Sequence, residues 1–148
     1  MTINTSAAIV EKQAEHIAIS ASASIANAAY STEAQATALV LTDKVRFADA
    51  VLDITLPTLA TSGKSVHLYR RDKNIKGSNH APVPGDNFPH IYIGSFPLNA
   101  VGTQQFISLP GITISDDCEF YIKNDSGVAT SGTTVLTLTP WTWNGKSS

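Results

Sequence analysis

Between residues 38 and 139 the chain is a series of short runs in which apolar and polar residues alternate, and turn-forming residues separate these runs. The clearest run spans residues 48–56, where Ala, Ala, Leu, Ile and Leu occupy every second position. Successive side chains of a β-strand point to opposite faces, so this run predicts a strand with one buried face. Pro57 ends the strand, because proline has no amide hydrogen to give to a neighbouring strand.

The other runs predict further strands. Residues 64–71 form the second clear run, with Val66 and Leu68 facing inward, and shorter runs cover 37–42, 91–96, 104–109, 119–123 and 133–139. Residues 124–127, Asn-Asp-Ser-Gly, have the composition of a hairpin-type turn. Many short strands with turns at this spacing favour a mainly β fold, and we expect residues 37–148 to form a single antiparallel β-sandwich or jelly roll.

Residues 1–36 differ from the rest, because they are rich in Ala and Ser and contain no Gly or Pro. Their larger aliphatic residues fit a helical period and also a strand period, so a helical arm and an extended arm both remain open. In either form the apolar stripe is narrow and buries little area alone. We interpret this segment as an N-terminal arm that docks on a partner or on its own domain, with simple disorder as the alternative. Ile9, Ile17 and Ile25 are the expected contacts of the arm.

Residues 72–89 form the longest stretch without periodicity. Loops longer than about 12–15 residues are usually functional or disordered. We therefore expect a contact loop here, with Asn79, His80 and Phe88 among the residues that touch a partner.

Composition limits the kind of partner. The 148-residue chain has a formal net charge of −2 and only 15% charged residues, below the roughly 25% usual for soluble domains. This charge balance argues against nucleic acid, whose phosphates attract clustered Lys and Arg. No segment approaches the about 20 apolar residues of a membrane span, so no membrane partner is expected. Cys118 is the lone cysteine, which excludes an intramolecular disulfide and suits folding in a cytoplasm.

The residues that usually bind metals or carry out catalysis are scattered along the chain. His16, His67, His80 and His90 share no metal-ligand spacing, and Cys118 has no second thiol near it. No Gly-x-Ser-x-Gly motif is present to mark a nucleophilic serine.

The carboxylates do not form a catalytic or calcium-binding pattern either. Asp49 and Asp53 fall on the same strand face about 13 Å apart, which is too far for paired acid and base catalysis on a sugar. Asp116, Asp117 and Glu119 lack the glycine-punctuated spacing of a calcium loop. The sequence therefore predicts no catalytic, cofactor or metal site, and a protein that is not an enzyme.

Aromatic residues offer a different kind of binding surface. Exposed rings stack on sugars and nucleobases, and Tyr69, Tyr92, Tyr121, Trp141 and Trp143 are candidates for such a platform. The two tryptophans share a face if the last strand continues past residue 140. We favour packing of these tryptophans against a sheet edge or a neighbouring subunit, with a carbohydrate platform as the alternative.

Three segments resemble those of small virion structural proteins of tailed bacteriophages, most of all the capsid decoration, or cement, proteins. They are LPTLATSG at residues 56–63, GSFPLNAVGTQQ at 94–105 and YIKNDSGVA at 121–129. The resemblance covers residues 48–139 and lies in the style and order of the segments.

This resemblance implies a β-sandwich or jelly-roll body, often trimeric, that straddles subunits of the major capsid protein. The expected function is that of a non-enzymatic virion protein that stabilises the head, lies at the capsid surface and is assembled in the host cytoplasm. The alternatives are a tail- or fibre-associated structural protein and a carbohydrate- or receptor-binding β-sandwich module.

Overall fold

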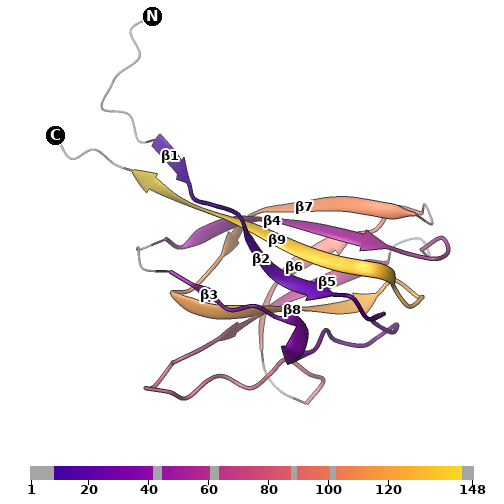
Figure 1. The fold of residues 1–148 in the computed structure, drawn as a ribbon, viewed down its shortest axis with the longest axis horizontal. Coiled ribbons are helices and arrows are strands. Elements are labelled where there is room, and N and C mark those ends of the chain that lie inside the picture. Colours follow the sequence, from indigo (N-terminus) through magenta and orange to yellow (C-terminus); the bar gives the residue numbers. More distant parts are fainter. Residues whose placement is uncertain (1–8, 42–44, 61–63, 88–89, 101–102, 145–148) are drawn as a thin grey trace, which may run out of the picture.

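Two antiparallel sheets pack face to face in the computed structural model, which describes residues 9–41, 45–60, 64–87, 90–100 and 103–144 (Figure 1). This arrangement confirms the predicted mainly β fold and its antiparallel sandwich architecture. Within these residues no helix is long and apolar enough to cross a membrane.

Sheet A has the strand order β1-β9-β4-β7, and β2 pairs with β9 beyond the end of β1. Its strands are β1 (Ile9–Lys12), β2 (His16–Ala21), β4 (Phe47–Thr55), β7 (Gln104–Thr113) and β9 (Ser131–Asn144). Sheet B has the order β3-β8-β5-β6, formed by β3 (Leu39–Val40), β5 (Ser65–Asp72), β6 (Ile91–Pro97) and β8 (Asp117–Asp125). A short 3-10 helix, η1 (Glu33–Gln35), lies between β2 and β3.

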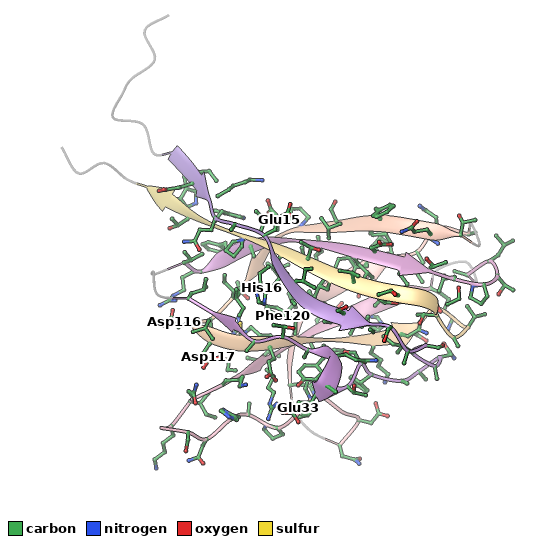
Figure 2. The ribbon with its side chains drawn as sticks, viewed as in Figure 1. Glu15, His16, Glu33, Asp116, Asp117 and Phe120 are labelled. Carbon is green, nitrogen blue, oxygen red and sulfur yellow. The ribbon has the colours of Figure 1, made fainter. Side chains whose placement is uncertain are left out.

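The inward faces of both sheets form the core. The alternation predicted for the run at 48–56 is confirmed, because its inward side chains are at most 1% exposed: Ala48, Ala50, Leu52, Ile54 and Leu56. Val66 and Leu68 of β5 are also fully buried, as expected. Sheet B contributes Phe120, which Figure 2 shows between the two layers. Most of the core is therefore held by strand alternation, which buries one face of each sheet.

Strand β9 continues past Pro140, which is the condition under which the two tryptophans share one face. Pro140 pairs with Ala48 of β4, and its carbonyl accepts a hydrogen bond from the Gln13 amide at 2.8 Å. The amide nitrogen and the carbonyl of a strand residue point toward the same neighbouring strand. The amide hydrogen that Pro140 lacks would therefore point toward the gap between β1 and β2, and not toward β4. The proline thus removes no hydrogen bond between β9 and β4.

The described part of the N-terminal segment contains the strands β1 and β2 and the short helix η1, and much of it belongs to the sandwich. β2 pairs with β9 from His16 to Ala21, and a β-bulge shifts the register between Ile17 and Ile19. Strict alternation would place these two isoleucines on one face, but the extra residue separates them. Ile17 is 54% exposed whereas Ile19 is fully buried.

Beyond β2 the chain crosses from sheet A to sheet B. Ile25 is 3% exposed, and its carbonyl accepts hydrogen bonds from Thr130 and from the side chain of Asn124. Tyr30 forms a β-bridge with Lys123 of β8. Residues 16–36 therefore close one side of the sandwich and contribute to its core.

The turn at residues 124–127 does not connect a hairpin, which corrects the sequence-based prediction. β8 pairs with β3 and β5 in sheet B, whereas β9 pairs with strands of sheet A, so this connection passes between the sheets. Asn124 is fully buried and donates to the Ile25 and Val128 carbonyls, while its side-chain oxygen accepts from the Ser126 amide. Turn composition alone does not specify which sheet the next strand joins.

Replacing Ile19 by Ala tests whether the N-terminal segment is part of the folding unit. Removal of a fully buried isoleucine side chain leaves a cavity, so we expect a loss of about 2–5 kcal/mol in the free energy of unfolding. Ile17→Ala is the matched control on the same strand, with an expected change within about 0.5 kcal/mol because Ile17 faces outward. Urea denaturation of both variants measures the difference, and equal stabilities would show that β2 is not packed as described.

Candidate functional site

The outward side of sheet A carries mostly apolar side chains from several strands, and these are exposed or half-buried. We call this surface the sheet A face, and its members are Val10, Ile17, Phe47, Val51, Phe106, Val135, Thr137, Trp141 and Trp143. Phe106 is 69% exposed and Trp143 58%. Across the sheet, Ile17 and Val51 pair with Thr137 from its two sides. Large contiguous apolar patches are rare on soluble monomers and mark contact surfaces.

A groove of about 280 Å³ crosses this face, lined by Glu15, Val51, Asp53, Phe106, Val135, Thr137 and Thr139. The Asp53 carboxylate accepts two hydrogen bonds from the Gln104 side chain, at 2.8 and 3.0 Å. Figure 2 shows Glu15 on the sheet A side of the molecule, at the start of β2. The groove can take an apolar side chain that lies next to a Lys or Arg, because two carboxylates border apolar walls.

The tryptophans lie at one end of the sheet A face. Trp141 stacks on Phe47 with ring centroids 5.0 Å apart, and Trp143 meets Trp141 edge to face at 6.1 Å. The Trp141 Nε1 donates to Asp49 at 3.1 Å. Burial acts to raise the pKa of Asp49, but hydrogen bonds from the Gly111 amide, Lys12 and Trp141 outweigh it and hold the pKa below its ordinary value. Trp141 is thus fixed in place. Trp143 pairs with Val10 of β1, and Figure 1 shows β1 and the end of β9 projecting together from the sandwich.

Sheet B is different, because a buried polar cluster and the crossing segment cover part of its outward side. Arg71 donates to Glu119 at 2.9 Å and to Glu33 of η1 at 2.7 Å, and Lys73 donates to Glu119 at 2.8 Å. The hydroxyl of Tyr121 donates to Glu119 at 2.9 Å. Figure 2 shows Glu33 on the side of sheet B that faces away from sheet A. The cluster ties the N-terminal segment to sheet B.

Electrostatics in this cluster favour the charged form of Glu119 and the neutral form of Tyr121. Burial acts to raise the pKa of Glu119, but hydrogen bonds from Lys73, Tyr121 and Arg71 outweigh this effect and hold the pKa below its ordinary value. Burial, followed by the hydrogen bond to Glu119, raises the pKa of the Tyr121 hydroxyl well above its ordinary value. Each charge has an oppositely charged neighbour, which is the arrangement of a structural ion cluster.

The long loop after β5 folds back on sheet B. Arg71 Nε donates to the Ala81 carbonyl at 2.7 Å, and Asp86 accepts from Lys123 at 2.8 Å. At its tip, Lys76 and Asn79 form a β-bridge, and the Asn74 amide donates to His80 Nδ1 at 3.1 Å. The loop is therefore tethered to sheet B on the C-terminal side of its tip, through Ala81 and Asp86.

The structure places the residues expected to contact a partner in several separate regions. Ile17, Trp141 and Trp143 lie on the sheet A face, and the backbone of Ile9 pairs with Asn144 at the end of β9. Asn79 and His80 are exposed at the loop tip, away from that face, and Phe88 lies outside the described residues. Ile25 lies in the core and offers no side-chain surface to a partner in this fold.

Phe106, Val51 and Val135 on the sheet A face were not identified from the sequence. The available signal was Phe106, an aromatic residue on the polar side of the run at 104–109. The proposed aromatic platform is also divided. Tyr121 is fully buried, Tyr69 and Tyr92 lie on sheet B, and the two tryptophans lie on sheet A.

The acidic side chains near β8 have separate partners. Asp116 pairs with Arg46, Asp117 accepts from Asn74, and Glu119 belongs to the cluster described above. Cys118 is buried, and burial raises the pKa of its thiol. Among the described residues, no group of three or more His, Cys, Asp or Glu side chains is placed to hold a metal ion.

Comparisons of the sequence with protein-family models, with curated proteins and with solved structures found no match.

Replacing Glu119 by Gln tests whether the polar cluster stabilises the fold. Arg71 and Lys73 would lose their shared buried carboxylate, so we expect a loss of about 3–5 kcal/mol at neutral pH. Because the folded pKa of Glu119 is below the ordinary value of 4.5, its contribution is complete above that pH and disappears as the pH falls through the folded pKa.

Thermal unfolding of both proteins between pH 7 and pH 3 measures this dependence. The wild type should lose stability toward acid more steeply than Glu119→Gln. Asp116→Asn, which breaks the exposed pair with Arg46, is the control, with an expected change below about 1 kcal/mol. Parallel acid profiles of the wild type and Glu119→Gln would contradict the assignment.

Proposed function

We propose that this protein is a non-enzymatic structural protein, and specifically a capsid decoration protein of a tailed-bacteriophage virion that binds the major capsid protein. The observation that carries the proposal is the exposed sheet A face, where Ile17, Phe106 and Trp143 are each more than half exposed. The segments at 56–63, 94–105 and 121–129 supply the virion assignment by their resemblance to such proteins.

The chemistry of the sheet A face suits a protein partner. Aromatic and aliphatic side chains are flanked by threonines, so burial removes apolar area from water and leaves few charges to desolvate. The groove with Glu15 and Asp53 adds a place where an apolar side chain and a neighbouring Lys or Arg of the partner fit together.

A shell built of repeated subunits offers the same contact many times. A symmetric protein that contacts several subunits gains from effective concentration, so each individual contact can be weak. Under this proposal the protein lies at the capsid surface and self-associates as a trimer, as the resemblance to decoration proteins implies.

The charged residues also support a structural function. Glu119 and Arg71 are buried and form an ion pair, and Glu119 also pairs with Lys73. Glu119 and Arg71 therefore neutralise each other and do not face a cleft. We therefore test binding to a partner and not turnover of a substrate.

Ile17→Ala and Phe106→Ala test the proposal, because both side chains are exposed and their removal leaves the core intact. We expect each change to cost about 1–2 kcal/mol of binding, or roughly tenfold in affinity for the shell. Particles that lack the chain are mixed with the purified protein, and the bound fraction is measured by co-sedimentation. Tyr92→Ala, a 56% exposed aromatic residue on sheet B, is the matched control and should bind like the wild type.

Electron microscopy with an antibody against the chain then locates the bound protein. Regular label over the head supports the proposal. Label confined to the tail would replace it with a tail- or fibre-associated structural protein, and a chain that is absent from particles would overturn the virion assignment.

A further inference from the structure

A continuous strip of aromatic and imidazole rings lies on the outward side of sheet B. We call it the aromatic strip, and its members are Tyr30, His67, Tyr69, His90 and Tyr92. Tyr69 is its centre, with ring centroids 4.6 Å from His90 and 5.7 Å from both Tyr30 and Tyr92. His67 continues the strip at 6.1 Å from Tyr92.

The strip is assembled from parts of the chain that are distant in sequence. His67 and Tyr69 belong to β5, Tyr92 belongs to β6, and Tyr30 is placed by its β-bridge to Lys123 of β8. Tyr92 is 56% exposed, although the other four rings are half-buried. The core does not require an exposed tyrosine at this position, since the inward neighbours of the strip already fill the space between the sheets.

Hydrogen-bonding groups accompany the rings. The hydroxyl of Ser95 lies 2.6 Å from the Tyr92 hydroxyl and 2.7 Å from His67 Nδ1. His67 Nε2 lies 3.9 Å from Asp125, which also pairs with Lys64 at 3.3 Å.

The other end of the strip has a similar arrangement. The hydroxyl of Tyr30 donates to Asp86 at 3.2 Å, and Lys123 lies 4.9 Å from the centroid of the Tyr30 ring. Burial raises the pKa of Tyr69, so its hydroxyl remains a donor through the neutral range. The pairs Lys123–Asp86 and Lys64–Asp125 each combine one positive and one negative charge.

We propose that the aromatic strip binds a neutral saccharide, with a sugar ring stacked on the exposed face of Tyr92 and its hydroxyls bonded by His67, Ser95 and the flanking Lys64–Asp125 pair. The C–H face of a pyranose is apolar and its rim carries hydroxyls, which matches an exposed ring bordered by donors and acceptors. A site on sheet B does not require the protein to be attached to a capsid.

Charge balance favours a neutral sugar over single-stranded nucleic acid. Nucleobases also stack on aromatic rings, but proteins that bind single strands combine such rings with a positively charged groove for the phosphates. Here the ammonium groups of Lys64 and Lys123 are each paired with a carboxylate. The strip therefore lacks the net positive charge that a phosphate backbone needs.

The test begins with the purified full chain on an array of neutral and anionic oligosaccharides, and with a single-stranded DNA oligonucleotide in solution. We expect binding to at least one series of neutral saccharides and no preference for DNA. The best neutral oligosaccharide is then titrated by calorimetry into the wild type and the variants.

Tyr92→Ala should weaken binding about tenfold or more, the usual effect of losing one stacked ring. Tyr92→Phe keeps the ring and should retain binding, whereas His67→Ala should weaken it through the lost polar contact. Phe106→Ala is the matched control on sheet A, since it removes an exposed ring of similar size from the other face.

Thermal unfolding of each variant serves as the check that its fold is intact. The proposal would be overturned if the chain bound none of the neutral saccharides or preferred DNA. It would also be overturned if Tyr92→Ala left the affinity unchanged or if Phe106→Ala lowered it equally. None of these outcomes depends on whether the sheet A face binds a capsid.

Discussion

Pairing along β9 is the interaction on which the rest of the structure depends. Its inward side chains Leu136 and Leu138 are fully buried, while its edges pair with β1 and β2 on one side and with β4 on the other. The same strand therefore orders the N-terminal segment, fills the core and presents Val135 and Trp141 on the sheet A face. A surface carried by a central strand is rigid, because close packing beneath it leaves little freedom to rearrange.

The two outward faces differ in a way that the fold itself does not require. A sandwich needs one buried face for each sheet, and the remaining faces are normally polar. Sheet B follows this rule in part, because the Arg71–Glu119 cluster and the segment from Tyr30 to η1 cover one region of its outward side, whereas Tyr92 remains exposed. Sheet A has Phe106 and Ile17 exposed instead. Since these residues add nothing to the core, contact with another molecule is the physical reason we assign to them.

Strand positions were predictable from the sequence because alternation directly records which face of a sheet is buried, as in the run at 48–56. Other features depend on contacts that no local pattern contains. The bulge that separates Ile17 from Ile19 is imposed by pairing with β9, and the passage of the chain between sheets after Asn124 is fixed by hydrogen bonds to the distant Ile25 carbonyl. The aromatic strip likewise depends on Tyr30, which only the folded chain brings to Tyr69.

The two proposed surfaces have a geometric relation with a functional consequence. The sheet A face and the aromatic strip lie on opposite sides of a two-layer sandwich, so attachment through one leaves the other directed outward. A single stacked sugar gives weak binding, but many copies displayed on one particle act together through effective concentration. An array held by sheet A would thus convert a weak saccharide contact at Tyr92 into firm attachment to a glycan-covered surface. Under these two proposals, one exposed tyrosine in each copy would be sufficient.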